Sequence, residues 1–200
     1  DTLGDLTAAM NRTLTRHGLP ERTRQQMRTA LGNGARRLME LSVPSGTDSA
    51  LFETLLAGYH ADYAAHCRIE TAPYPGVAAL LRTLHTQGRK LAIVSNKPDE
   101  AVRTLRADFF ADAVQIAVGE TAAIRRKPAP DMLLAAMEQL GADPAGTVFV
   151  GDSEVDIATA RAADLPCISV LWGFRDRDVL ERAGAQQFAA DIAQLQALLG

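Results

Sequence analysis

From residue 77 to residue 171, short runs of Val, Ile and Leu alternate with longer segments of helical periodicity, and this alternation constrains the fold more than any other feature. The runs Leu91–Val94 and Val148–Val150 contain no polar residue, which is typical of strands buried on both faces. Strands that alternate with helices in this way pair in parallel, and the helices cover the sheet. The sequence therefore predicts an α/β core with an open parallel sheet and helices on both faces.

The first seventy residues differ from the rest because they show helical periodicity only. Apolar residues predict helices from Leu3 to about Gly18, over 21–31 and over 35–41, and Asp48 or Ser49 is placed to begin a longer one. Beyond them, helices are expected over 77–87, 98–107, 130–140 and 153–163, and strands over 90–95, 114–118, 147–151 and 167–171. We therefore expect two domains, an all-helical domain over 1–70 and a Rossmann-like α/β core over 71–200.

Composition narrows the classes of protein that the chain can belong to. The 200 residues are 47% hydrophobic and 22% charged, which is ordinary for a globular protein and excludes a disordered one. A net charge of −3 offers no basic field for nucleic acid or an anionic membrane, and no apolar run is long enough to span a bilayer. The two cysteines form no metal or disulfide motif, and the first residues do not resemble a signal peptide. We therefore expect a cytoplasmic, soluble protein.

Asp152 and Asp156 are the first candidates for chemistry. Asp152 follows a predicted strand and Asp156 lies four residues on, so both carboxylates can face one point above the sheet. A few carboxylate oxygens suit Mg²⁺, which keeps waters and shares a substrate phosphate. The alternative is structural, because Asp152 can cap the next helix and Asp156 can favour its positive end. The residues alone leave both interpretations open.

Ser95, Asn96 and Lys127 are the candidates for binding an anion. Ser95 and Asn96 end a predicted strand just before a helix, where a hydroxyl and backbone N–H groups can hold a phosphate, although the same residues are common helix caps. Lys127 precedes Pro128, which stiffens its loop, and its ammonium suits a phosphoryl oxygen and neighbouring carboxylates. The alternative for Lys127 is an exposed loop lysine.

Taken together and in order, these motifs resemble those of the haloacid dehalogenase-like hydrolases, and within them the phosphoglycolate phosphatase-like group. The matching stretches are Tyr74-Pro75-Gly76-Val77, Val94-Ser95-Asn96-Lys97-Pro98, Lys127-Pro128-Ala129-Pro130-Asp131 and Val150-Gly151-Asp152-Ser153-Glu154-Val155-Asp156. Asp164, Pro166, Val170 and Trp172-Gly173-Phe174 continue the pattern, and residues 1–70 look like the inserted helical cap of the family. The resemblance covers essentially the whole chain.

The resemblance implies hydrolysis of a phosphate monoester with Mg²⁺. Ser95 and the Asn96 backbone would hold the phosphoryl group, and Lys127 would neutralise its charge and position the nucleophile. Asp152, supported by Asp156, would bind Mg²⁺. The cap would close over the site and select the substrate, and we expect Asn33 in the Gly32-Asn33-Gly34 loop, together with Arg36, to make that selection.

The sequence departs from the family at its first motif. The family carries Asp-x-Asp-Gly-Thr, with its nucleophile and its acid/base aspartate, on a central strand just before the segment that begins here as Asp1. Asp1 and Asp5 have the wrong spacing to replace that motif. We expect the complete protein to contain the missing strand. The alternatives are a strand borrowed from a second copy in a homodimer, or a sheet that closes over the gap.

The leading hypothesis is therefore a phosphatase for a small phosphorylated metabolite, with 2-phosphoglycolate as the expected substrate. A phosphatase for a sugar phosphate or for pyrophosphate is an alternative, and so is a catalytically inactive relative that binds phosphate or a partner, because the nucleophile aspartate is absent from these residues. A phosphonate hydrolase of this superfamily would need a lysine in the cap that forms a Schiff base, and residues 1–70 contain no lysine. A dehalogenase needs no Mg²⁺, so the predicted magnesium ligands Asp152 and Asp156 count against it.

Overall fold

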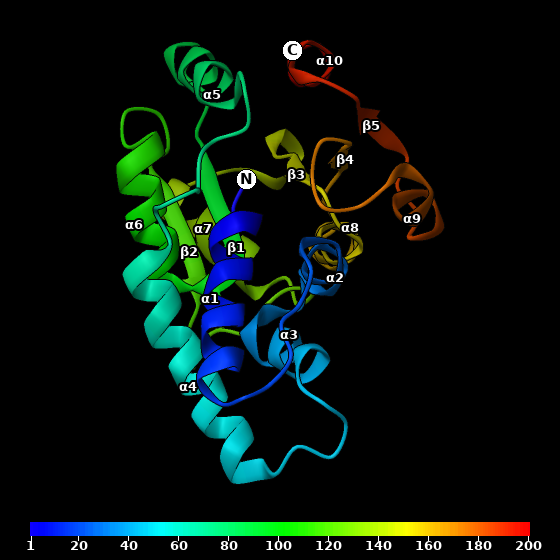
Figure 1. Ribbon diagram of the computed structural model, residues 1–200. Coiled ribbons are helices and arrows are strands. Elements are labelled where there is room, and N and C mark those ends of the chain that lie inside the picture. Colours follow the sequence, from blue (N-terminus) through cyan, green and yellow to red (C-terminus); the bar gives the residue numbers. More distant parts are fainter. The chain divides into compact units, whose positions relative to one another are not determined.

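The computed structural model describes residues 1–200, which form two compact units, Asp1–Ala72 and Pro73–Gly200. The first unit contains helices only (Figure 1). These are α1 (Leu3–Arg16), α2 (Arg24–Ala30), α3 (Gly34–Ser42) and α4 (Ser49–His66). The helix α2 begins later than the sequence predicts because Thr23 and Gln26 form a reciprocal capping box that starts the helix there. Asp48 begins α4, since its carboxylate accepts hydrogen bonds from the Ala50 and Leu51 amides.

The core of the first unit forms where the apolar stripes of the four helices meet. Helix α1 packs against α4, as Figure 1 also shows, and the Tyr59 and Tyr63 rings of α4 stack with their centroids 6.1 Å apart. The largest fully buried apolar side chains of this core are Met10, Leu14, Met27, Met39 and Leu55. Arg12 donates to the buried Asp62 carboxylate at 2.6 and 2.8 Å, so an ion pair also joins α1 to α4.

Asp5 ties the end of the first unit back to its first helix. Its carboxylate is 2% exposed and accepts hydrogen bonds from the amides of Ile69, Glu70 and Thr71 at 2.9–3.1 Å. Burial by itself raises the pKa of Asp5, but these hydrogen bonds outweigh burial and hold the pKa below its ordinary value. The segment after α4 therefore depends on one ionised carboxylate.

We expect Asp5→Asn to lower the free energy of unfolding by about 2 kcal/mol. The Asn side chain has only one acceptor oxygen and no charge, whereas three backbone N–H groups need an acceptor. A group whose pKa is lowered by folding stabilises the protein above its unfolded pKa, and that stability is lost as the pH falls through the folded value. The difference in the free energy of unfolding between wild type and variant should thus be at its full size at pH 7 and become smaller below about pH 4. Urea unfolding at several pH values measures it. Glu138→Gln, at an exposed carboxylate, is the control, and equal effects of the two variants would contradict this role of Asp5.

The second unit alternates helices and strands. Its elements are α5 (Val77–Thr86), β1 (Ala92–Pro98), α6 (Asp99–Phe110), β2 (Ile116–Glu120), α7 (Asp131–Leu140), the 3₁₀ turn η1 (Pro144–Gly146), β3 (Phe149–Gly151), α8 (Glu154–Ala162), β4 (Cys167–Val170), α9 (Arg177–Arg182), β5 (Gln187–Ala189) and α10 (Ile192–Leu199). All strand pairs are parallel, so the predicted α/β class with parallel strands is confirmed. The sequence pattern predicts no element at α9, β5 or α10, which are short and follow the last long apolar run. None of the helices is long and apolar enough to cross a membrane.

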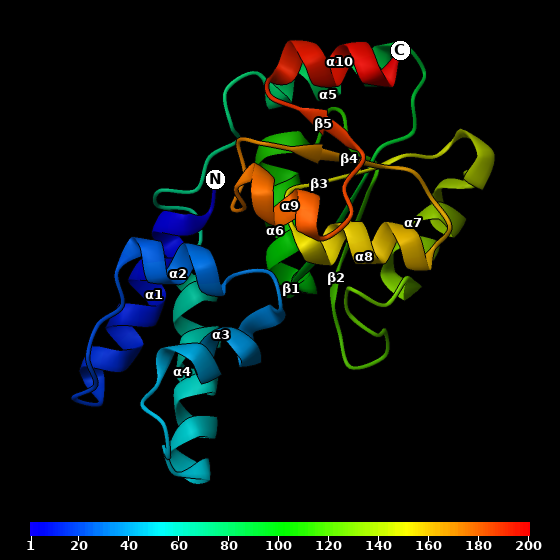
Figure 2. The same cartoon turned by 90° about the vertical axis from the view of Figure 1, so that its right-hand side faces the viewer.

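The strands form two sheets, not the single sheet that the sequence predicts. The first sheet pairs β1 with β2, and the second has the order β3-β4-β5 (Figure 2). The strands β1 and β3 are not hydrogen-bonded to each other, so each keeps one edge without a partner strand. The exposure of Val150, at 37%, agrees with an incompletely covered β3.

Helices cover both faces of the strands. Leu80 of α5 and Leu195 of α10 pack with Ile168 of β4 on one face, where the two helices also contact each other. On the other face, Leu133 of α7 and Ala160 of α8 pack with Phe149. Helix α7 also covers the β1–β2 sheet through a second cluster that contains Val94, Val118, Met132 and Ala136. Because α7 packs against both sheets, its apolar side chains join them.

Candidate active site

The site lies in the second unit, beyond the regular part of β1. The pairing of β1 with β2 is regular up to Val94 and shifts before Pro98, so the residues between leave the ladder. Within this stretch, the Asn96 side chain donates to the Lys127 carbonyl at 2.9 Å and accepts from the Lys127 amide at 2.8 Å. The amide of Asn96 therefore fixes the backbone of Lys127 beside β1, a pairing that the sequence analysis did not anticipate. Ser95 Oγ accepts the Lys97 amide at 3.3 Å and donates to no protein atom.

Lys127 is held inside the site and is not the exposed loop lysine of the alternative interpretation. Its side chain is 12% exposed, and Nζ donates to Asp156 Oδ1 at 2.7 Å and to the Val94 carbonyl of β1 at 3.2 Å. The same ammonium lies 5.6 Å from the centroid of the Phe149 ring in β3. An ammonium has three N–H donors, so one is left over after these two hydrogen bonds.

Asp156 has both carboxylate oxygens engaged by the protein. Oδ1 receives Lys127, and Oδ2 receives the amides of Asp152 and Ser153 at 3.1 Å and the Ser153 hydroxyl at 2.6 Å. Burial by itself raises the pKa of Asp156, but Lys127 and the other donors hold the pKa below its ordinary value. Gly151 is required here because a Cβ at that position would overlap the Asp156 side chain. Asp156 also completes the capping box that starts α8 with Ser153.

Asp152 has a different environment. It follows β3 directly, and its Oδ2 accepts the Phe174 amide at 2.7 Å. Burial, and after it the charge of Asp156, raises the pKa of Asp152, while the Phe174 amide and two lysines oppose the shift. A Cβ at Gly173 would overlap the Asp152 carboxylate, so the loop after β4 forms a cradle for this group. Asp152 is thus a partly buried carboxylate with spare acceptor capacity.

The donor set fits Mg²⁺ at Asp152 better than at Asp156. No group of three or more His, Cys, Asp or Glu side chains gathers anywhere in the structure, so no closed metal cage exists. A Mg²⁺ ion that keeps several waters and shares a phosphate needs only one or two carboxylates. Asp156 accepts four hydrogen bonds in all, whereas the Asp152 carboxylate accepts one from Phe174, so Asp152 has more acceptor capacity left for a metal.

Two residues near the site were missed by the sequence analysis. Arg175 donates through Nε and Nη2 to the two oxygens of Glu154, at 2.7 and 3.1 Å, and its side chain is 9% exposed. The pair joins the loop after β4 to the first turn of α8, next to Asp152. The two residues are 21 positions apart and share no periodic pattern, so no signal in the sequence pairs them.

The remaining predicted residues, Asn33 and Arg36, belong to the first unit. Asn33 precedes α3 and makes no side-chain cap hydrogen bond. Arg36 donates to both oxygens of Glu53 at 2.9 Å, and its guanidinium carbon lies 5.3 Å from the centroid of the Phe52 ring. Within its unit, Arg36 is therefore held in place by a bidentate ion pair.

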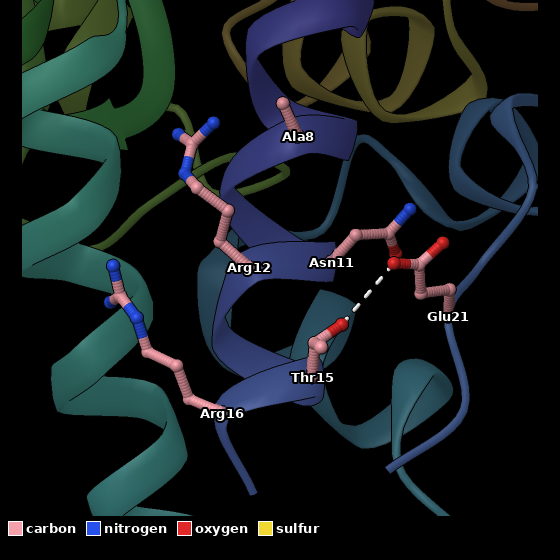
Figure 3. A pocket seen from close by; sticks show the side chains of 6 residues that line it. All are labelled: Ala8, Asn11, Arg12, Thr15, Arg16 and Glu21. Carbon is pink, nitrogen blue, oxygen red and sulfur yellow. Dashed lines mark hydrogen bonds between the residues drawn. The ribbon is translucent and has the colours of Figure 1, made fainter. Parts of the chain in front are cut away.

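A hollow of about 580 Å³ also lies in the first unit, over α1 (Figure 3). It is lined by Ala8, Asn11, Arg12, Thr15, Arg16 and Glu21. Thr15 donates to Glu21, the Asn11 amide pairs with the Arg22 backbone, and both arginines pair with Asp62. The polar side chains around this hollow therefore pair mainly with groups of their own unit.

Comparison with known proteins agrees with the geometry. The family model described as haloacid dehalogenase-like hydrolase matches residues 1–170. The phosphoglycolate phosphatase of Pseudomonas putida is 32% identical over 205 residues, which cover 100% of this chain and 74% of that relative. The phosphoglycolate phosphatase of Rhodospirillum rubrum is 31% identical, with 100% of this chain and 86% of the relative covered. The crystal structure of a protein from Lactobacillus delbrueckii subsp. bulgaricus superposes with a TM-score of 0.93 and 33% identity, covering 100% of this chain and 92% of that one.

The parallel α/β fold and the matching family model identify the protein as a hydrolase. The chain belongs to the haloacid dehalogenase-like hydrolase family. The predicted resemblance to its phosphoglycolate phosphatase-like group is confirmed, and with it the expectation of a phosphoric monoester hydrolase.

We expect Asp156→Asn to destabilise the protein by about 3 kcal/mol, because it leaves the buried Lys127 ammonium without its counter-charge. Arg182→Gln removes an exposed ion pair with Asp178, which contributes little, and is the matched control. Urea unfolding followed by circular dichroism measures both variants. Equal, small effects of the two substitutions would show that the Lys127–Asp156 pair does not support the fold.

Proposed function

We propose that this protein hydrolyses a small phosphate monoester, with 2-phosphoglycolate as its substrate, and that Mg²⁺ is bound at Asp152. The observation that carries the proposal is the Lys127 ammonium, held between Asp156 and the Val94 carbonyl with one N–H donor to spare. A buried cation beside a carboxylate with spare acceptor capacity suits a phosphoryl group that is bound together with a divalent metal. The relatives named as phosphoglycolate phosphatases support the substrate.

The phosphoryl group would bind between Ser95 and Lys127. The Ser95 hydroxyl proton has no protein acceptor, so it can be donated to a phosphoryl oxygen. The third N–H of Lys127 can be donated to another oxygen of the same group. Helix α6 begins at Asp99, four residues after Ser95, and its N-terminal end favours negative charge nearby. These groups would hold and orient the phosphate and neutralise its charge, which supplies much of the acceleration in phosphoryl transfer.

Asp152 would hold Mg²⁺, and Asp156 would act through Lys127. When bound, Mg²⁺ would neutralise charge on the phosphoryl oxygens. Asp156 would keep the ammonium charged and aimed, because both of its oxygens are occupied by protein donors. In this proposal Asp156 supports the metal site indirectly, through the turn that it shares with Asp152.

The other parts of the reaction follow from the family. The nucleophile and the acid/base group would come from the Asp-x-Asp-Gly-Thr motif, which the family carries before the position of residue 1. The helical unit would act as the cap, and Asn33 and Arg36 would select the substrate. A cytoplasmic location and a small phosphorylated metabolite as partner belong to the same proposal, and a homodimer stays an open alternative to a monomer.

We expect Lys127→Ala, in the full-length protein, to lower kcat for 2-phosphoglycolate by a factor of about 10² to 10³, because a charged donor to the phosphoryl group is lost.

We expect Asp152→Asn to raise the Mg²⁺ concentration that gives the half-maximal rate, because the proposed carboxylate ligand loses its charge. Phosphate release at varied Mg²⁺ measures both effects, and Arg182→Gln should leave both parameters unchanged.

The same assay separates the alternatives. Turnover of a sugar 6-phosphate in preference to 2-phosphoglycolate would replace the substrate, an outcome suggested by the N-acetylmuramic acid 6-phosphate phosphatase of Pseudomonas aeruginosa, which is 30% identical. If the protein hydrolyses no phosphate monoester but still binds phosphate, the proposal of an enzyme is wrong, and the alternative of a phosphate-binding protein takes its place. A rate that does not depend on Mg²⁺ would contradict the role of Asp152.

A further inference from the structure

We propose that Gly173, Phe174 and Arg175 form a clamp that positions the Asp152 carboxylate, and that Glu154 anchors this clamp to α8. The inference rests on the proposed function, because it concerns the residue that would hold Mg²⁺ there. Arg175 and Glu154 are positioning residues in this scheme and contact neither substrate nor metal.

Two residues of the clamp touch the Asp152 carboxylate directly. The Phe174 amide donates to Oδ2 at 2.7 Å, which is short for a hydrogen bond from a backbone amide to a carboxylate. Gly173 leaves the space that the carboxylate occupies, since any Cβ there would overlap its Cβ, Cγ and Oδ2 atoms. Together they leave Asp152 little freedom to rotate, and they fix which oxygen turns toward the loop.

The loop that carries these two residues is itself fastened by Arg175. Its guanidinium makes two parallel hydrogen bonds to Glu154, which lies only two residues after Asp152. A bidentate pair of this kind is directional as well as strong, and the 9% exposure of the Arg175 side chain limits screening by solvent. The chain from Asp152 to Glu154 and the chain from Gly173 to Arg175 are therefore linked at both ends.

This geometry makes the position of Asp152 depend on a pair of residues that would not touch the metal. Groups that orient a metal ligand from behind typically change metal affinity by 10- to 100-fold when they are removed. An isolated structural ion pair would instead change the unfolding midpoint and leave the affinity alone. The difference between these two outcomes makes the clamp testable.

The test compares Arg175→Gln, Glu154→Gln and the double variant with wild type, all in the protein as its gene encodes it. Isothermal titration with Mg²⁺ should show each single variant binding on the order of ten-fold more weakly. The double variant should be no weaker than either single one, because the two residues act through one pair. Arg175→Lys, which keeps the charge but not the planar fork, should fall between wild type and Arg175→Gln.

A second readout does not depend on the metal. Hydrogen exchange of the Phe174 amide, followed by NMR in the presence of EDTA, should be faster in each single variant than in wild type, because its carboxylate partner is no longer held. Arg182→Gln, which removes an exposed ion pair of the nearby α9, should change neither readout. Glu154→Gln keeps the test decisive if Arg175→Gln does not fold.

The two readouts also keep this inference apart from the proposed function. Wild-type Mg²⁺ affinity and wild-type Phe174 protection in both single variants would overturn the clamp. Independent, multiplying effects of the two substitutions would also overturn it. If the wild-type protein does not bind Mg²⁺, the metal assignment of the proposed function fails, and the Phe174 amide alone then decides whether the clamp exists.

Discussion

The carboxylate of Asp156 is the acceptor on which the arrangement around the candidate site depends. It receives the Lys127 ammonium on one oxygen and two amides and a hydroxyl from the Asp152-Ser153 turn on the other. A buried carboxylate stays ionised only when such partners compensate for the lost solvation, and these partners come from two separate segments of the chain. The ion pair that keeps the Asp156 carboxylate charged therefore also holds the Lys127 loop at the end of β3.

The same ammonium links the two sheets. Lys127 Nζ also donates to the Val94 carbonyl in β1, and the Asn96 side chain holds the Lys127 backbone. The strands β1 and β3 share no hydrogen bond, so these polar contacts and the apolar side chains of α7 connect the β1–β2 sheet to the β3–β5 sheet. The candidate site thus lies beside β1 and β3, where side chains from the Lys127 loop contact both sheets.

The carboxylates of Asp152 and Asp156 lie four residues apart but have different environments. Asp156 is surrounded by donors and has its pKa lowered, whereas burial and the charge of Asp156 raise the pKa of Asp152. Such a pair offers one group committed to the structure and one with acceptor capacity left for a ligand. Spacing alone treats the two aspartates as equivalent, and only their neighbours distinguish them.

Local pattern in the sequence was sufficient for much of this protein. The alternation of apolar runs with helical segments predicted the parallel α/β class, and the motifs around Ser95, Lys127 and Asp152 predicted the family, because both depend on residues close together in the chain. Tertiary structure decided the rest: the use of Asn96 to hold Lys127, the contact of Phe174 with Asp152, and the pairing of Arg175 with Glu154 of α8. These contacts join residues 21 to 31 positions apart, and such distant pairs leave no periodic signal. Which buried charge meets which donor is settled only when packing brings the segments together.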